Sequence, residues 1–216
     1  MLKAYKFRIY PTKSQRTKME RTLDLCRWTY NQTLAYRKEA WEKEGKSVSK
    51  YETHGLLPAW KEEKPELNDV FSQTLQNAQE RVDLALKAFF RRVKAGENPG
   101  YPRFRGRGWY DSFTYPQKGF KLNAGKLYLS KIGNIKIKLH RSIEGKIKRL
   151  TVRRAATGKW FACFSVEIED QLRPPWKDGS LVGVDVGLES FATLSNGETI
   201  ANPRFFREEE TELARV

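Results

Sequence analysis

Residues 2–15 read LKAYKFRIYPTKSQ and contain a strand, a break and the start of a helix. Apolar and basic side chains alternate from Leu2 to Tyr10, which is the period of a half-buried β-strand. Pro11 ends this pattern. Thr12 precedes Gln15 by three residues, which is the spacing of a helix capping box. The stretch therefore predicts a basic strand that leads directly into a helix.

A long amphipathic helix is expected from there to Glu44, because apolar side chains recur every three or four residues and Gly45 follows as a natural stop. After a connector that contains Pro58 and Pro65, a second helix is predicted, and Gly96 closes it. The apolar stripe of the first helix is Met19, Leu23, Cys26, Tyr30 and Leu34; that of the second is Phe71, Leu75, Ala78, Val82, Leu86, Phe89 and Val93. Such stripes indicate two helices that pack against each other.

From Pro99 onward, apolar and polar side chains again alternate with a period of two residues. The clearest predicted strands are 126–129, 135–139, 147–153 and 160–167, and the predicted turns are Gly133-Asn134, Glu144-Gly145 and Thr157-Gly158. These runs predict a small antiparallel sheet or barrel with one apolar and one very basic face. Since strand 2–10 has the same character, we expect it to join this sheet, with the helices inserted between. The fold class is therefore α+β.

The positive charge is concentrated in the middle of the chain. The formal net charge is +15, and residues 99–160 contain 16 basic against 2 acidic side chains, whereas residues 161–216 contain 5 against 11. Such asymmetry indicates a polyanionic partner for the middle segment. The alternative is the basic surface of a ribosomal-type or merely soluble protein.

The segment 100–110, GYPRFRGRGWY, interleaves aromatic rings with arginines. Rings of this kind stack on unpaired bases, and guanidinium groups pair with phosphate oxygens. The alternative is that the rings are core and the arginines a solvated rim. The pattern does not distinguish RNA from DNA. The binding candidates are Tyr101, Arg103, Phe104, Arg105 and Arg107, with Lys136, Lys138, Arg153 and Arg154 on the predicted sheet.

Residues 181–200, LVGVDVGLESFATLSNGETI, set Asp185 into a short apolar strand flanked by glycines, and this strand is predicted to be buried. Strands FATL and ETIA should follow, joined by the hairpin signal Asn196-Gly197. A carboxylate is costly to bury unless it is paired or binds a metal, and Mg²⁺ prefers oxygen ligands. Asp185 is therefore the candidate metal ligand and catalytic residue. The alternative is an aspartate that faces solvent or caps a turn.

Several classes of protein and site are disfavoured. No apolar run approaches the length of a membrane span, and the N-terminus carries charges where an export signal would be apolar. Cys26 and Cys163 lie far apart, so neither a disulfide nor a zinc site is expected. His54 and His140 each lack a ligand partner at suitable spacing. A cytoplasmic protein without a membrane partner is expected.

Five segments resemble the N-terminal half of the TnpB (OrfB-type) transposon proteins, which are related to the type V CRISPR effectors. The segments are AYKFRIYPTKSQ, LCRWTYNQTLAYRKEAW, GYPRFRGRGWYDSFTYPQ, LYLSKIGNIKIKLHRSIEGKIKRLTVRRAATGKWFACFSVE and GVDVGLESFATLSNGETI. The resemblance implies a wedge-type β-barrel (1–11 and 99–170) split by a helical recognition domain (12–98). A linker (171–180) and the incomplete start of a ribonuclease H-like RuvC nuclease domain (181–216) would follow.

The activity implied by this resemblance is RNA-guided DNA cleavage with Mg²⁺. The implied partners are a guide RNA from the transposon end and double-stranded target DNA. Only Asp185 corresponds to one of the family's catalytic carboxylates. The later glutamate and aspartate, and the CxxC zinc ribbon between them, have no counterpart here. This chain alone is therefore expected not to cleave DNA, and the alternative is a naturally truncated module that binds nucleic acid without catalysis.

Overall fold

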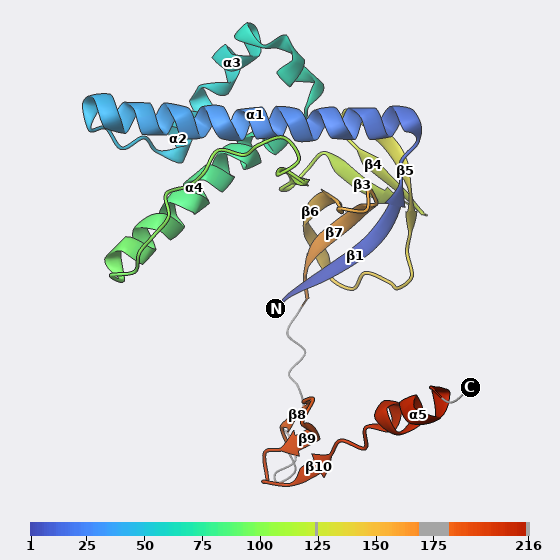
Figure 1. Ribbon diagram of the computed structural model, residues 1–216. Helices are drawn as coiled ribbons and strands as arrows, with labels where there is room; N and C mark the ends of the chain where they lie inside the picture. Colours follow the sequence, from blue (N-terminus) through green and yellow to red (C-terminus); the bar gives the residue numbers. More distant parts are fainter. Residues whose placement is uncertain (124, 169–181, 215–216) are drawn as a thin grey trace. The chain divides into compact units, whose positions relative to one another are not determined.

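A computed structural model describes residues 1–123, 125–168 and 182–214 (Figure 1). The chain divides into two compact units, Met1–Glu169 and Asp170–Val216, and each is described by itself. The predicted linker 171–180 lies outside the described residues.

The first unit is built on a seven-stranded antiparallel sheet with the strand order β2-β6-β7-β1-β5-β4-β3. The strand β1 (Leu2–Tyr10) lies near the centre of the sheet, between two strands that come more than 120 residues later in the chain. The others are β2 (Ser112–Tyr115), β3 (Phe120–Asn123), β4 (Lys126–Leu129), β5 (Gly133–Lys138), β6 (Lys146–Arg154) and β7 (Trp160–Glu167). The prediction that the N-terminal strand joins the later sheet is confirmed.

The sheet curls into a nearly closed barrel. Its two edge strands, β2 and β3, are consecutive in sequence, and only residues 116–119 join them. In a flat sheet six strand spacings would separate these edges by about 29 Å. The five residue-to-residue steps from Tyr115 to Phe120 span at most about 18 Å, so the two edge strands must approach each other. The hydroxyl of Tyr115 donates across this gap to the carbonyl of Ser130 at 2.9 Å.

Alternation along the strands puts one face of the sheet inside the barrel. Tyr5, Phe7 and Ile9 of β1 are buried, and the ring of Phe7 lies 6.0 Å from that of Phe164 on β7. The intervening side chains of β1 point outward, and they include Lys6 and Arg8. The predicted division into an apolar and a basic face is therefore confirmed.

The helix α1 (Lys13–Glu44) has the ends that the sequence predicts. Thr12 and Gln15 form the capping box, and Gly45 ends the helix with φ 61°. The side-chain amide of Gln15 also donates to the carbonyl of Asn134 on β5 at 2.7 Å, which fixes the start of the helix to the barrel. The predicted apolar stripe is buried throughout: Met19, Leu23, Cys26, Tyr30 and Leu34.

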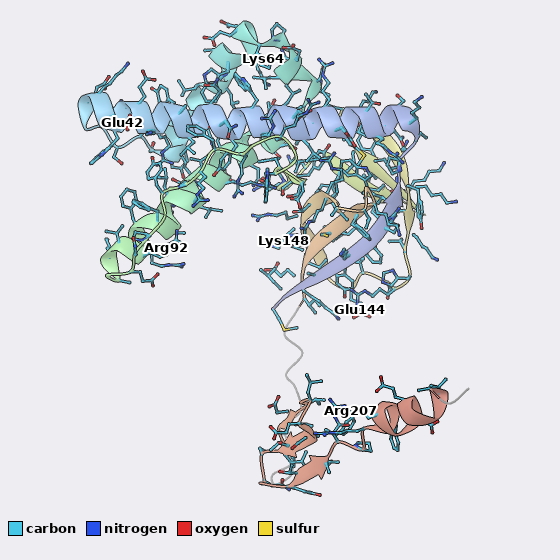
Figure 2. The ribbon with its side chains drawn as sticks, viewed as in Figure 1. Glu42, Lys64, Arg92, Glu144, Lys148 and Arg207 are labelled. Atoms are coloured by element: carbon cyan, nitrogen blue, oxygen red, sulfur yellow. The ribbon has the colours of Figure 1, made fainter. Side chains whose placement is uncertain are left out.

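The second long helix, α4 (Ser72–Lys94), packs along α1. Both helices start near the barrel and end away from it, and residues 95–111 return beside α4 (Figure 1). Glu42 and Arg92 mark the two far ends (Figure 2). The predicted face of α4 is buried from Leu75 to Leu86, but Val93 is exposed because the last turn extends beyond the core.

An ion pair joins the two helices at a nearly buried position. The carboxylate of Asp83 on α4 lies 3.2 Å from the guanidinium of Arg37 on α1 and 3.0 Å from Lys87. Burial raises the pKa of Asp83, but hydrogen bonds from Lys87 and Arg37 outweigh this effect and hold the pKa below its usual value. The resulting stabilisation is present at neutral pH and is lost as the pH falls through the lowered pKa.

Two features of the first unit differ from the prediction. The connector folds into α2 (Lys50–Gly55), α3 (Leu57–Glu63) and a 3₁₀ helix, η1 (Pro65–Asp69), none of which was predicted. The turn expected at Gly133-Asn134 lies earlier: Lys131 has φ 70°, and Gly133 already belongs to β5. The burial of Ile132 fixes this earlier turn. The turn at Thr157-Gly158 is confirmed, with φ 73° at Gly158.

The second unit contains β8 (Val184–Asp185), β9 (Ser190–Leu194), β10 (Thr199–Ala201) and α5 (Phe205–Leu213). The strands form an antiparallel sheet in the order β10-β9-β8, and the predicted hairpin at Asn196-Gly197 is confirmed. No helix in the described part of the chain is both long enough and apolar enough to cross a membrane.

Gly119 should be essential to the closure of the barrel. Its φ is 87°, and an added Cβ would lie 2.7 Å from Cε1 of Phe71 and 2.9 Å from Cδ1 of Tyr115. We expect Gly119→Ala to lower the free energy of unfolding by about 1–3 kcal/mol more than Gly158→Ala. The latter has the same backbone cost but open space around the new methyl group. Denaturant unfolding measures both, and equal losses would contradict the prediction.

Candidate nucleic-acid interface

The outward side of the barrel forms the candidate interface. Four adjacent strands, β7, β1, β5 and β4, contribute to it. Lys138 lies opposite Arg8 and Lys136 opposite Tyr10, while Arg8 also faces Phe161 on the other side. We call this surface the strand face, and its members are Lys6, Arg8, Tyr10, Lys126, Tyr128, Lys136, Lys138 and Phe161.

Cations and rings alternate closely on the strand face. Lys6 Nζ lies 4.5 Å from the ring centre of Phe161, and the guanidinium of Arg8 lies 5.3 Å from the same ring and 5.4 Å from that of Tyr10. Tyr10 is 47% exposed and Tyr128 is 43% exposed. Among the described residues, no carboxylate forms an ion pair with the five cations of this face. Exposed rings beside unpaired cations can stack on bases and bind phosphates.

The predicted arginines of β6 have a different environment. Arg153 Nε lies 2.9 Å from Asp111 Oδ2, and Arg154 Nη1 lies 3.3 Å from Glu20 Oε1. These carboxylates partly neutralise both guanidinium groups. Arg153 and Arg154 therefore carry less free positive charge than Lys136 and Lys138.

Residues 100–110, which we call the arginine loop, lie on the helices rather than on the barrel face. Asn31 of α1 clamps the loop backbone, because its Nδ2 donates to the carbonyl of Arg105 at 3.0 Å and its Oδ1 accepts from the Arg105 amide at 2.8 Å. Tyr101 packs edge-on against Phe89, with ring centres 5.4 Å apart. The loop is thus held in place, while the side chains of Arg103, Phe104, Arg105 and Arg107 are exposed.

The last two aromatic side chains of this loop differ in exposure. Tyr110 is buried against Tyr30, and this burial raises its pKa. Trp109, by contrast, is 77% exposed. The interpretation of the rings as core therefore holds for Tyr110 and not for Trp109.

The structure thus places the nine predicted binding residues in three groups: the arginine loop on the helices, two lysines on the strand face, and two ion-paired arginines on β6. The sequence analysis missed six members of the strand face: Lys6, Arg8, Tyr10, Lys126, Tyr128 and Phe161. The alternation in residues 2–10 that predicts β1 already contained a signal for three of them, because its polar positions must all point to one side.

Asp185 is exposed, so the prediction of a buried strand around it is wrong. Its strand β8 has two residues and, among the described strands, pairs with β9 alone, where Thr193 lies opposite Asp185. The neighbouring Val184 is 59% exposed, because β8 is the edge strand of a small sheet. Gly183 and Ser195 hold the start of β8 through two hydrogen bonds of 2.8 and 2.9 Å.

The described residues do not form a metal site. They contain no group of three His, Cys, Asp or Glu side chains that could hold an ion. Asp185 is therefore a single exposed carboxylate, and this does not fit the ligand set that a bound Mg²⁺ requires. Cys26 and Cys163 are both free thiols, and His140 lies against the ring of Phe7 at 5.0 Å.

Comparison with known proteins gives full-length matches to this chain. It is 33% identical over 220 residues to the "Putative RNA-guided DNA endonuclease InsQ" of Escherichia coli (strain K12), covering 100% of this chain and 52% of that protein. It is 34% identical to the "Putative RNA-guided DNA endonuclease" of Streptomyces pristinaespiralis, covering 99% and 53%. The chain spans about half the length of these curated relatives.

A family model described as a helix-turn-helix domain of the OrfB/IS605 type matches residues 1–46. In this structure the matched segment is the strand β1 followed by the single long helix α1. Similar solved structures include a Cas12f1–sgRNA–target DNA complex (14% identity, TM-score 0.42, covering 100% of this chain and 60% of that chain). A CRISPR-Cas12f ternary complex matches with 12% identity and a TM-score of 0.43, covering 92% and 51%.

The two hydrogen bonds from Asn31 should hold the backbone of the arginine loop in its observed conformation. We expect Asn31→Ala to speed hydrogen exchange of the Arg105 amide about tenfold, because the hydrogen bond that protects this amide, worth about 1.4 kcal/mol, is among the two that are lost. Asn31→Asp keeps the acceptor oxygen and should retain most of the protection. Amide exchange followed by NMR measures this, and equal rates in the two variants would argue against the clamp.

Proposed function

Because this chain belongs to the TnpB (OrfB-type) family, we propose that it is the nucleic-acid-binding part of an RNA-guided DNA endonuclease. Its partners would be a guide RNA from the transposon end and double-stranded target DNA. The observation that carries this proposal is the identity of 33–34%, over practically the whole chain, to two proteins named "Putative RNA-guided DNA endonuclease". Since the chain spans about half of those relatives, the cleavage activity would belong to the longer protein.

The proposed domain roles follow the two units. The barrel would be the wedge domain, helices α1 to α4 the recognition domain, and the described residues 182–214 the beginning of a RuvC-like nuclease domain. The strand face supports the wedge role, because its five cations are unpaired in the described part of the chain and three rings accompany them. The arginine loop would supply a second basic surface from the helices.

We propose Asp185 as one carboxylate of the nuclease site in the longer protein, where it would bind Mg²⁺ together with other ligands. Its position on the edge strand β8 leaves it accessible. A single carboxylate does not define a two-metal site. We therefore assign no cleavage step to the residues of this chain.

A second candidate function is nucleic-acid binding without catalysis. The isolation of Asp185 among the described acidic residues favours it. Such a module would hold guide RNA and occupy DNA without cutting it. The two candidates share the binding role of the first unit and differ only in whether the catalytic partners of Asp185 occur in the same polypeptide.

The RNA that co-purifies with the chain tests the shared role. We expect one dominant RNA, encoded beside the gene for this chain, rather than a random population. Sequencing the RNA from the purified complex measures this, and a random population would instead support a general RNA-binding protein. Incubation of the same complex with Mg²⁺ and a guide-matched duplex should yield no cleavage, and cleavage would exclude the module without catalysis.

The strand face should contribute directly to the salt dependence of binding. Each phosphate contact on single-stranded nucleic acid adds about 0.7 to the log–log salt slope. Lys136→Gln with Lys138→Gln should therefore reduce the slope for RNA by about 1.4. Lys38→Gln with Lys43→Gln removes the same charge from helical ion pairs and should leave the slope nearly unchanged. Equal salt slopes in the two double variants would show that the strand face does not contact the nucleic acid.

A further inference from the structure

A pocket of about 390 Å³ lies between α1, α4 and the end of the arginine loop. Its wall includes Tyr30, Arg81, Leu84, Arg105, Trp109 and Asp111. We propose that this pocket, the Trp109 pocket, holds one unpaired nucleotide whose base stacks on Trp109. The proposal rests on the proposed function for the source of that nucleotide, an RNA or a DNA strand.

The loop presents the indole of Trp109 in a defined orientation. The Trp109 amide donates to the carbonyl of Gly106 at 3.2 Å, which closes a tight turn, and Gly108 within it has φ 88°. A Cβ on Gly106 would lie 3.5 Å from Cδ1 of Trp109, so the indole lies against this glycine. A large aromatic ring that is 77% exposed on a fixed turn is available to stack on a base.

Arg105 supplies a positioned cation beside this ring. Its backbone is held from both sides by Asn31, and its guanidinium lies 5.8 Å from the ring centre of Tyr30. In the described part of the chain this guanidinium forms no ion pair. It is therefore available to donate to a phosphate or to an acceptor on a base.

Arg81 and Asp111 give the pocket fixed polar groups. Arg81 is committed to β2, since its Nη1 donates to the carbonyl of Ser112 at 2.9 Å and its Nη2 to Thr114 Oγ1 at 3.1 Å. It adds positive charge that cannot move away. Asp111 uses Oδ2 for Arg153, and its Oδ1 remains an acceptor for a base N–H.

These groups together match a nucleotide better than an apolar ligand. The volume falls within the range of small-molecule pockets, which is about 300–1,000 Å³. An apolar ligand would bury the Arg105 guanidinium and Asp111 Oδ1 without hydrogen-bond partners, which costs free energy. A nucleotide instead offers a flat ring for Trp109, an anion for the arginines and a donor for Asp111.

Binding of short oligonucleotides by Trp109→Ala tests the proposal. The probes are an unstructured 12-nucleotide RNA, the DNA of the same sequence, and the duplex of each. We expect Trp109→Ala to weaken binding of single strands about 5- to 150-fold, the effect of losing one base–aromatic stack. Binding of the duplexes should change little. Fluorescence anisotropy of labelled probes measures the affinities.

Trp41→Ala is the matched control, because Trp41 is also on the surface, 63% exposed, and lies outside this pocket. It should leave single-strand affinity unchanged. Binding of a single strand should quench part of the tryptophan fluorescence of the wild-type chain. This quenching should disappear in Trp109→Ala and persist in Trp41→Ala. A larger loss for the RNA probe or for the DNA probe identifies the strand that supplies the nucleotide.

Two results would overturn the inference while leaving the proposed function intact. One is wild-type affinity of Trp109→Ala for both single strands, with the strand-face variant Lys136→Gln/Lys138→Gln still weakened. The other is an equal loss in Trp41→Ala. Failure of the wild-type chain to bind any of the four probes would contradict both the pocket and the proposed function.

Discussion

The first unit depends on one pairing constraint. The strand β1, at the start of the chain, must pair along both of its edges with strands that come more than 120 residues later, β5 and β7. Eight residues of β1 are in register with β7 and three with β5. The central strands of the barrel therefore cannot form until β5 and β7 pair with β1. The helical segment between β1 and β2 must leave the barrel and return to it, so this segment needs fixed attachments to the barrel. Gln15 gives one through Asn134, and Arg81 gives the other through Ser112 and Thr114.

The same constraint links the core to the candidate interface. Side chains alternate along β1, so the register that buries Tyr5, Phe7 and Ile9 also directs Lys6, Arg8 and Tyr10 outward. A slip of one residue would exchange the two sets. Core packing and the basic outer face are therefore not independent properties. Pairing with β7 then brings Phe161 beside Arg8, which places an aromatic ring among the cations.

The sequence predicts what is encoded locally and fails where distant residues decide. Alternation identifies β1, β4 and β7, and the Thr12–Gln15 capping box and Gly45 give both ends of α1. The connector helices are too short for a helical period, although Ser49 and Glu52 form a capping box that could have revealed α2. Nothing near Arg153 or Arg154 indicates their ionic partners, since Asp111 and Glu20 lie 42 and 134 positions earlier. Apolar neighbours suggested burial of Asp185, but burial requires a covering layer, and β8 is an edge strand.

The proposed binding role and the proposed nuclease role place different structural demands on the two units. Among the described residues, the hydrophobic core of the first unit consists of side chains between Tyr5 and Val166, with Ile168 packed against it. The barrel and the helices therefore have their own packing, and both the strand face and the arginine loop lie on this scaffold. Asp185, by contrast, sits on a two-residue strand whose sheet has one strongly buried apolar side chain among its described residues, Ala192. A metal site demands carboxylates held within fractions of an ångström, whereas a basic surface with exposed rings tolerates small movements. The first unit thus has the packed scaffold that the proposed nucleic-acid binding needs, and the rigidity that the proposed catalysis needs would have to come from additional packing around β8.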